Sequence, residues 1–219
     1  MIECLLGKNL NELKSIVAGL GLPQFVARQI ADWLYNKKVY SFDEMTNLSK
    51  SVRLQLAQKY SVGRTLPLHE VISIDGTKKY LFQTNSGAIE TVYIPEADRA
   101  TVCVSSQVGC KMNCAFCMTG KQGFSGNLSV AEILNQIFSL PDSAHLTNIV
   151  LMGMGEPLHN KDEVFKALKI LSDGDGIAIS KRRITLSTSG IVPNIEAVAS
   201  ELGVKLAISL HAPNNELRS

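Results

Sequence analysis

The chain has 219 residues, 45% of them hydrophobic, and a formal net charge of only +2. This length suffices for one or two hydrophobic cores, because domains typically span about 100–200 residues. The longest apolar runs fall far short of the roughly 20 residues of a membrane-spanning helix, and no charged-then-apolar leader opens the chain. We therefore expect a globular protein of the cytoplasm.

Residues 1–65 are predicted to form a small helical domain. Apolar residues recur there at helical spacing in three segments: one that Asn11 would cap, one with Phe25 on its apolar stripe, and one that begins near Ser49. This part carries nine Lys and Arg against five Asp and Glu, whereas residues 66–219 carry 13 against 15. A small basic excess is commonly a solvated surface; attraction to a phosphate backbone is the sharper alternative.

Residues 66–96 change to a period of two and are predicted to form a β-hairpin extension. The stretch "EVISIDGTKKYLFQT" alternates around Asp75-Gly76, a strong hairpin signal, and "AIETVYIP" continues as a third strand. In that strand Glu90 shares a face with Ala88, Val92 and Ile94. Desolvation on an apolar face would raise the pKa of this carboxyl group. The alternative is an edge strand with two partly wet faces.

From residue 97 the predicted strands and helices alternate. The expected strands are "TVCVSSQ", "TNIVLMG", "RITLSTSG" and "VKLAISLH"; the expected helices are "SVAEILNQIFSL", which Ser129 would cap with Glu132, "NKDEVFKALKILSD" and "VPNIEAVASEL". Alternating βα units predict an α/β fold with a parallel sheet or barrel. Chemistry is then expected at the carboxyl ends of the strands.

Three of the five cysteines, Cys110, Cys114 and Cys117, lie on a short loop after the first of these strands. In a reducing compartment such a cluster favours metal binding or redox chemistry over a disulfide scaffold. Three thiolates can hold a 4Fe-4S cluster by three irons, which leaves the fourth iron open to a ligand. Zinc is the alternative, but all four histidines lie too far along the chain for a compact site: His69, His145, His159 and His211.

Polar residues also follow three later strands. They are Gly153, Gly155 and Glu156 in "LMGMGEP", Ser187 in "RITLSTSG", and Ser209 and His211 in "AISLHAP". The glycines would let the backbone approach a ligand closely, although the third glycine of a dinucleotide fingerprint is missing. A lone serine or histidine at a strand end is more often structural. Three consecutive strand ends favour a ligand site beside the cysteine loop.

Several of these stretches together resemble one known family. They are "CVSSQVGCKMNCAFCMTGKQGF", "MGMGEPLHN", "KRRITLSTSG", "AISLHAPNNELR" and the lead-in "IETVYIPEADRATVCVSSQ". They look like the radical S-adenosylmethionine (SAM) adenine carbon 2 RNA methyltransferases of the RlmN type. The resemblance implies a partial (β/α) barrel as the radical SAM core, residues 97–219, with about four of the family's six βα units. The helical domain of residues 1–65 and the hairpin extension of residues 66–96 would precede it.

The resemblance also implies roles for individual residues. Cys110, Cys114 and Cys117 would ligate the cluster, whose open iron chelates SAM. Glu90 would be the base that removes the proton from adenine carbon 2, and Cys103 would form a disulfide with a methyl-carrier cysteine to release the product. The residues matching the family's SAM contacts are Gly155, Glu156, Ser187, Ser209, Leu210 and His211.

The family's substrates are 23S ribosomal RNA and certain transfer RNAs, and its partners include an electron donor such as flavodoxin. The helical front domain is expected to help bind RNA. The adenine must leave its stack to reach the cluster, which costs a few kcal/mol and favours unpaired sites.

This sequence also departs from the family pattern. Two βα units, the methyl-carrier cysteine and a late asparagine contact are absent, and Cys4 is at the wrong end to substitute. We therefore expect a C-terminally truncated chain that is inactive in methyl transfer. Two alternatives stay open: the related methylation of adenine carbon 8, and a non-catalytic RNA-binding fragment.

Overall fold

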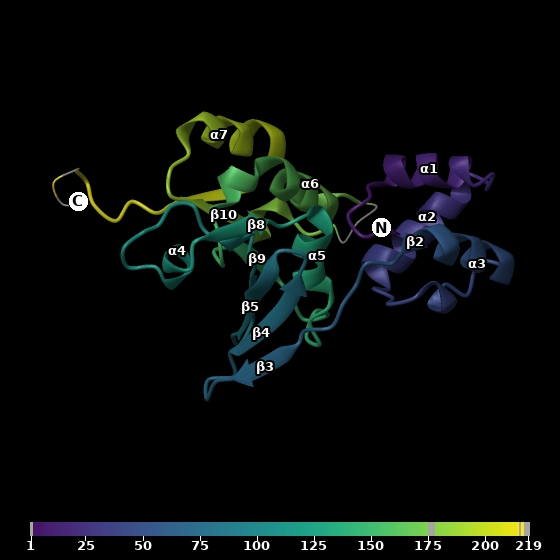
Figure 1. The fold of residues 1–219 in the computed structure, drawn as a ribbon, viewed down its shortest axis with the longest axis horizontal. Helices are drawn as coiled ribbons and strands as arrows, with labels where there is room; N and C mark the ends of the chain where they lie inside the picture. Colours follow the sequence, from purple (N-terminus) through teal and green to yellow (C-terminus); the bar gives the residue numbers. More distant parts are fainter. Residues whose placement is uncertain (1, 175–177, 215, 217–219) are drawn as a thin grey trace.

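The fold is seen in a computed structural model, which describes residues 2–174, 178–214 and 216. Residues 215, 217 and 218 of "AISLHAPNNELR" lie outside these described residues. A helical front domain lies at one end of the long axis, and the cysteine loop lies at the opposite end beyond a central sheet (Figure 1). Every described helix is too short or too polar to cross a membrane.

The front domain contains the three expected helices. It comprises β1 (Glu3–Cys4), α1 (Leu10–Gly19), α2 (Phe25–Ala31), the π-helical turn η1 (Asp32–Asn36), the 3₁₀ turn η2 (Phe42–Glu44), α3 (Lys50–Lys59) and β2 (Tyr60–Ser61). Helix α3 begins beside Ser49, as predicted, and the Ser49 side chain caps it by accepting the N–H of Val52.

Two details of the predicted front helices are wrong. Asn9, not Asn11, caps α1: its side chain accepts the N–H of Glu12, whose carboxylate accepts the N–H of Asn9 in return. Phe25 is 63% exposed, because α2 begins at this residue and buries the stripe that starts one residue later. That stripe consists of Val26, Ala27, Ile30 and Ala31.

The central sheet has seven strands in the order β11-β10-β9-β6-β5-β4-β3. They are β3 (His69–Ile72), β4 (Lys78–Thr84), β5 (Gly87–Pro95), β6 (Ala100–Cys103), β9 (Asn148–Leu151), β10 (Ile184–Thr188) and β11 (Lys205–Ile208). The last four named are mutually parallel, which confirms the α/β fold class. The hairpin strands join this same sheet, because β5 pairs antiparallel with β6. Among the described strands, no pairing closes the sheet into a barrel.

Helices cover one face of the sheet. They are α5 (Val130–Phe138), α6 (Lys161–Ser172), and α7 (Val192–Ala197) with the π-helical turn η5 (Val198–Leu202); two 3₁₀ turns, η3 (Pro157–Asn160) and η4 (Lys181–Arg183), precede α6 and β10. Ser129 caps α5 in a capping box with Glu132, as predicted. The strands bury alternate side chains on this face, including Ile89, Tyr93, Val102, Ile149 and Leu186.

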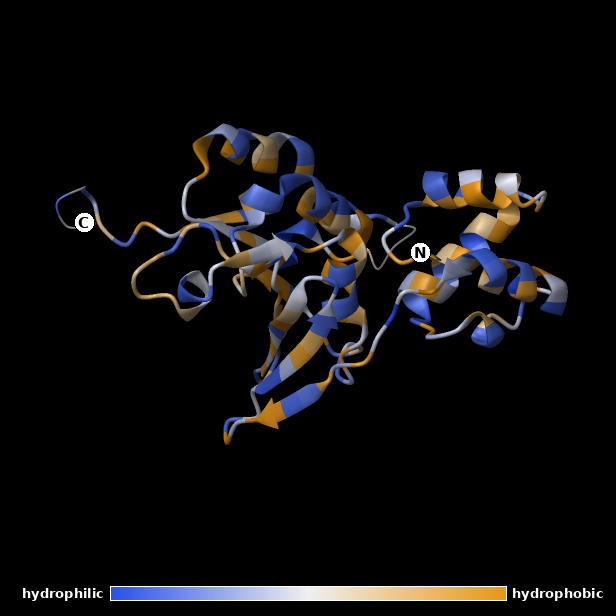
Figure 2. Cartoon of the chain, viewed as in Figure 1, coloured by the Kyte–Doolittle hydropathy of each residue, from blue (hydrophilic) through white to orange (hydrophobic). Residues whose placement is uncertain are grey.

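The opposite face of the sheet is open. Val92, Cys103, Val150 and Thr185 lie side by side across four strands on this face, and each is only partly buried. Glu90 lies two residues along β5 from Val92, so it shares the face. At the outer edge of the sheet, the hydrophobic end of β3 is exposed at Val71 and Ile72 (Figure 2).

Candidate functional site

One cavity of about 260 Å³ gathers most of the predicted site residues. It is lined by Cys110, Cys114 and Cys117, by Gly153, Gly155 and Glu156, and by Ser187, Ser209 and His211, together with Met112, Phe116, Leu151, Met152, Pro157, Thr188 and Ser189. These residues come from the cysteine loop and from the ends of β9, β10 and β11. The expected convergence of strand ends is therefore present. Glu90, Cys103 and Leu210 lie outside this lining.

A small two-stranded sheet, which the sequence analysis missed, forms the base of the cysteine loop. Strand β7 (Gln107–Gly109) pairs antiparallel with β8 (Phe124–Asn127), and the short helix α4 (Met118–Lys121) follows Cys117. Gly109 has a φ of +73°, and a Cβ there would lie 1.8 Å from the carbonyl oxygen of Gly123. That oxygen accepts the N–H of Cys110 at 2.9 Å. Glycine at position 109 thus lets the two strands close directly beneath the first cysteine.

The three loop cysteines are free thiols that face a shared cavity. Burial raises the pKa of the Cys110 thiol. Within the described residues, no three His, Cys, Asp or Glu side chains converge as they would on a single metal ion. An iron–sulfur cluster does not require such convergence, because each thiolate binds a different iron. A cavity lined by three thiols therefore fits a cluster held by three cysteines.

The glycine turn, residues 152–155, packs tightly on the segment after β6. A Cβ at Gly153 would lie 2.7 Å from Ser105 Oγ, and one at Gly155, whose φ is +100°, would lie 2.6 Å from Gln107 Cβ. These contacts lie within the protein rather than at a ligand. Both glycines still line the cavity with their backbone, so the turn presents main-chain groups to whatever the cavity holds.

The carboxylate of Glu156 is buried and already bonded to the protein. The side chain is 4% exposed, and its two oxygens accept the backbone N–H of Leu158 at 3.0 Å and the N–H and hydroxyl of Ser189 at 2.8 and 2.9 Å. Gln107 Oε1 accepts the N–H of Glu156 at 2.9 Å. Glu156 therefore ties the turn after β9 to the turn after β10. Residue patterns did not reveal the part of Ser189, because a serine two residues beyond Ser187 carries no distinct signal.

The ends of the paired strands β10 and β11 lie side by side at the cavity. The hydroxyl oxygens of Ser187 and Ser209 are 3.5 Å apart. His211 has a φ of +57°, unusual for a residue with a Cβ, and its ring lies 4.5 Å from the ring of Phe116 on the cysteine loop. This pair brings the last described strand end against the loop. Leu210 is 60% exposed.

Glu90 and Cys103 lie on the open face of the sheet. The side chain of Glu90 is 48% exposed and forms an ion pair with Lys79 at 2.9 Å. The expected desolvation of Glu90 is therefore wrong, because its face is open to water and carries a lysine beside it. The edge-strand alternative is wrong as well, since β5 lies between β4 and β6. Cys103 is partly buried, and burial raises the pKa of its thiol.

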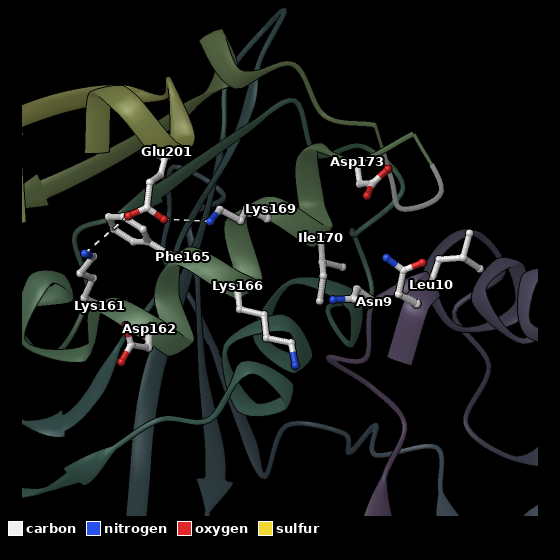
Figure 3. A pocket seen from close by; sticks show the side chains of 11 residues that line it. Asn9, Leu10, Lys161, Asp162, Phe165, Lys166, Lys169, Ile170, Asp173 and Glu201 are labelled. Atoms are coloured by element: carbon white, nitrogen blue, oxygen red, sulfur yellow. Dashed lines mark hydrogen bonds and ion pairs between the residues drawn. The ribbon is translucent and has the colours of Figure 1, made fainter. Parts of the chain in front are cut away.

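A larger cavity of about 570 Å³ lies between α1 and α6 (Figure 3). Two lysines of its lining form ion pairs with Glu201 of the same lining: Lys169 at 3.0 Å and Lys161 at 3.6 Å. Lys166 binds Glu12 of the front domain at 2.6 Å. None of the predicted site residues lines this cavity, so its size reflects the junction between two parts of the fold.

Comparisons with known proteins agree with this arrangement. The family model of the Radical SAM superfamily matches residues 104–219, just over half of the chain. That of the ribosomal RNA large subunit methyltransferase N-terminal domain matches residues 4–62. The two matched regions therefore contain the cysteine loop with its strands and the front helices, respectively.

Curated relatives are similar over nearly the whole chain. A probable dual-specificity RNA methyltransferase RlmN from Phocaeicola vulgatus is 56% identical, over 95% of this chain and 60% of its own length. Another from Bacteroides fragilis is 55% identical, over 98% and 63%. The dual-specificity RNA methyltransferase RlmN of Buchnera aphidicola is 46% identical, over 98% and 61%. The chain thus spans about three fifths of the length of these relatives.

A solved structure matches as well. The crystal structure of a radical SAM methyltransferase from Sphaerobacter thermophilus superposes with a TM-score of 0.93 at 44% identity, over 99% of this chain and 66% of that one. With the cysteine loop, the glycine turn and the strand ends all inside the matched superfamily region, the chain belongs to the radical SAM superfamily.

Proposed function

We propose that this chain supplies the cluster and SAM site for radical methylation of adenine carbon 2 in 23S ribosomal RNA and tRNA. The observation that carries the proposal is the single cavity shared by three free thiols, the glycine turn and the ends of β10 and β11. The names of the relatives, dual-specificity RNA methyltransferases, support RNA as the substrate class.

Membership of the radical SAM superfamily implies a 4Fe-4S cluster and SAM as cofactors. In our proposal Cys110, Cys114 and Cys117 hold the cluster, which supplies the electron that cleaves SAM homolytically. The backbone at Gly155 and the hydroxyls of Ser187 and Ser209 bind SAM, together with Leu210 and His211. Glu156, whose carboxylate is engaged by Ser189, contributes by holding the turn in place.

Glu90 is proposed as the general base. Its half-exposed carboxylate lies on the open face of the sheet, where an extruded adenine has access, and it can accept the proton from carbon 2. The ion pair with Lys79, at 2.9 Å, holds the carboxylate on this face.

Cys103 is the proposed thiol that releases the product. It shares the open face with Glu90 and pairs in register with Val92. By forming a disulfide with a methyl-carrier cysteine, it would break the bond between the carrier sulfur and the methylene carbon on the RNA. The electron pair of that bond stays with the methylene carbon, which takes up a proton and becomes the methyl group of the product. Cys4 is a poor candidate for the carrier, because it lies in β1 of the front domain. We propose that the carrier is not among the five cysteines of this chain.

Residues 1–65, with their basic excess, form the proposed RNA-binding domain, residues 66–96 the hairpin extension, and residues 97–219 the radical SAM core. An electron donor such as flavodoxin would reduce the cluster, and the cytoplasm is the proposed compartment because thiols stay reduced there.

The test is product analysis after anaerobic reconstitution with iron, sulfide, SAM and a ribosomal RNA fragment. The 219-residue chain should bind SAM and cleave it without methylating RNA, whereas a longer form with a carrier cysteine should yield 2-methyladenosine. In that longer form, Glu90→Gln should accumulate a protein–RNA crosslink while SAM cleavage continues. The control is Glu96→Gln, an exposed carboxylate also in an ion pair, which should behave as wild type.

Each alternative has its own outcome. Formation of 8-methyladenosine would assign the other ring position. RNA binding without SAM cleavage, in protein that holds its cluster, would reduce the function to RNA binding. Release of 2-methyladenosine at the normal rate by the Glu90→Gln variant would place the base elsewhere.

A further inference from the structure

On the side of β5 that faces β6, residues at or beside the glycine turn hold the backbone of Glu90, in place of a paired strand. The β5–β6 pairing covers only Val92–Pro95, so it ends before Glu90. Beyond that point the N–H of Glu90 donates to Met154 Sδ at 3.4 Å, and its carbonyl oxygen accepts the hydroxyl of Ser105 at 2.6 Å. Both backbone groups of Glu90 are thus satisfied by residues at or beside the glycine turn.

The hydroxyl of Ser105 forms hydrogen bonds both with β5 and with the glycine turn. The hydroxyl oxygen accepts the N–H of Met154 at 2.9 Å. Because the backbone N–H of Met154 can only donate, the Ser105 hydroxyl accepts that bond with its oxygen and donates its own hydrogen to the carbonyl oxygen of Glu90. Glu90, Ser105 and Met154 therefore form a closed ring of three hydrogen bonds, which we call the Ser105 ring.

The Ser105 ring is anchored in the core. Ser105 is fully buried, its N–H donates to Gln136 Oε1 at 2.8 Å, and its carbonyl accepts Gln136 Nε2 at 3.0 Å. Gln136 lies on α5, is fully buried, and also accepts the hydroxyl of Thr91 at 2.8 Å. Gly153 completes the fit, since a Cβ there would lie 2.7 Å from the Ser105 hydroxyl. Buried and mutually satisfied polar groups of this kind hold a unique geometry.

We propose that Ser105 is a positioning residue that couples the glycine turn to the strand segment bearing Glu90. A ligand bound at the turn then restricts the backbone of Glu90, so occupation of the SAM site orders the base. This inference rests on the proposed function, which supplies the ligand of the turn and the role of Glu90. The coupling itself is a property of the Ser105 ring and can be measured without catalysis.

The first experiment measures amide hydrogen exchange by NMR in the ligand-free chain. Ser105→Ala breaks two of the three bonds of the Ser105 ring and leaves only the weak bond from the Glu90 N–H to Met154 Sδ, so the amides of Glu90 and Met154 should both exchange about tenfold faster or more. The matched control is Ser106→Ala, because this neighbouring serine is similarly buried but its hydroxyl reaches the turn alone, through a weak 3.5 Å contact with the carbonyl oxygen of Met154. Faster exchange at Met154 alone, or equal effects of the two variants, would overturn the coupling.

The second experiment adds SAM to the cluster-loaded chain. In the wild type and Ser106→Ala, SAM should slow exchange at both Met154 and Glu90. In Ser105→Ala it should slow exchange at Met154 only. A merely structural role would lower SAM affinity without separating the two amides. Loss of the Glu90 response in Ser106→Ala, or its survival in Ser105→Ala, contradicts the proposal.

A third variant distinguishes loss of the coupling from misfolding of Ser105→Ala. Met154→Leu nearly conserves volume but removes the sulfur that accepts the Glu90 N–H. It should speed exchange at Glu90 while the amide at position 154, still bonded to Ser105, stays slow. If both amides accelerate equally, the Ser105 ring is not the coupling element. Failure of SAM to bind the wild type would refute the proposed function, whereas the ligand-free exchange results would still decide the role of Ser105.

Discussion

Lys79 Nζ lies 2.9 Å from a carboxylate oxygen of Glu90 on the face of the sheet that the helices leave open. Both side chains are about half exposed, so water screens the pair. The ion pair therefore orients the proposed base rather than holding the fold together.

We predict that Lys79→Met changes the free energy of unfolding by less than about 1 kcal/mol. The reason is that an exposed ion pair is only slightly lower in free energy than the two separate hydrated ions. Urea unfolding followed by circular dichroism checks this. A loss above about 2 kcal/mol would mean that Lys79 supports the fold in another way.

Glu156 should behave in the opposite manner. Its buried carboxylate accepts three hydrogen bonds, two of them from Ser189, and an amide cannot accept all of them. Glu156→Gln should therefore cost about 1–3 kcal/mol of unfolding free energy. The control is Glu196→Gln, an exposed carboxylate on α7, which should change the value by less than about 0.5 kcal/mol. Equal values for the two variants would contradict the anchoring role of Glu156.

The cysteine loop should account for all the iron. After anaerobic reconstitution we expect about four irons per chain, with the charge-transfer absorbance of an iron–sulfur cluster. Cys114→Ala should abolish both, whereas Cys4→Ala should retain both, because Cys4 lies in the front domain. Iron analysis and absorbance spectra provide the measurement. Stoichiometric zinc in the purified protein, with no absorbance after iron and sulfide are supplied, would reject the cluster.

Stability should fall in alkali through Tyr35. Burial raises the pKa of this phenol well above its ordinary value of about 10, and its hydroxyl donates to the carbonyl of Lys8 at 2.5 Å. Because the folded-state pKa is raised, the stabilisation is complete below pH 10 and is lost as pH rises above the unfolded pKa. There the slope contributed by Tyr35 approaches about 1.4 kcal/mol per pH unit.

Urea unfolding at several pH values between 9 and 11 tests this dependence. Tyr35→Phe should cost stability at pH 8 but flatten the fall above pH 10. Tyr40→Phe, which alters a 43% exposed ring, serves as the control and should keep the wild-type slope. An unchanged slope in Tyr35→Phe would assign the alkaline loss to other groups.

Local signals in the sequence predicted much of the fold. Ser129 caps α5 as expected, and α3 begins beside Ser49 as expected, because a helix start depends on residues within one turn. The Asp75-Gly76 turn does join two strands, since its geometry is equally local. The alternation of strands and helices predicted the parallel sheet and placed the cysteine loop beside the three later strand ends.

Other features depended on contacts between distant residues. Glu90 stood on an apolar stripe in the sequence, but which face of β5 is buried depends on where α5 packs, and that contact lies about 45 residues away along the chain. Strands β7 and β8 are short and separated by the cysteine loop, so neither has a recognisable period. The bond from Ser189 to Glu156 spans 33 residues and has no local signature.

The front domain and the cysteine loop lie at opposite ends of the long axis, which, in the proposed function, limits the RNA molecules that can bind both (Figure 1). An RNA that binds the front helices while its adenine enters the cavity must extend past the central sheet. A short single strand that contains only the target base would contact the cavity or the front domain, but not both. In the proposed function, the protein therefore selects its adenine by the three-dimensional shape of a folded RNA, because the front domain and the cavity must both contact that RNA at once.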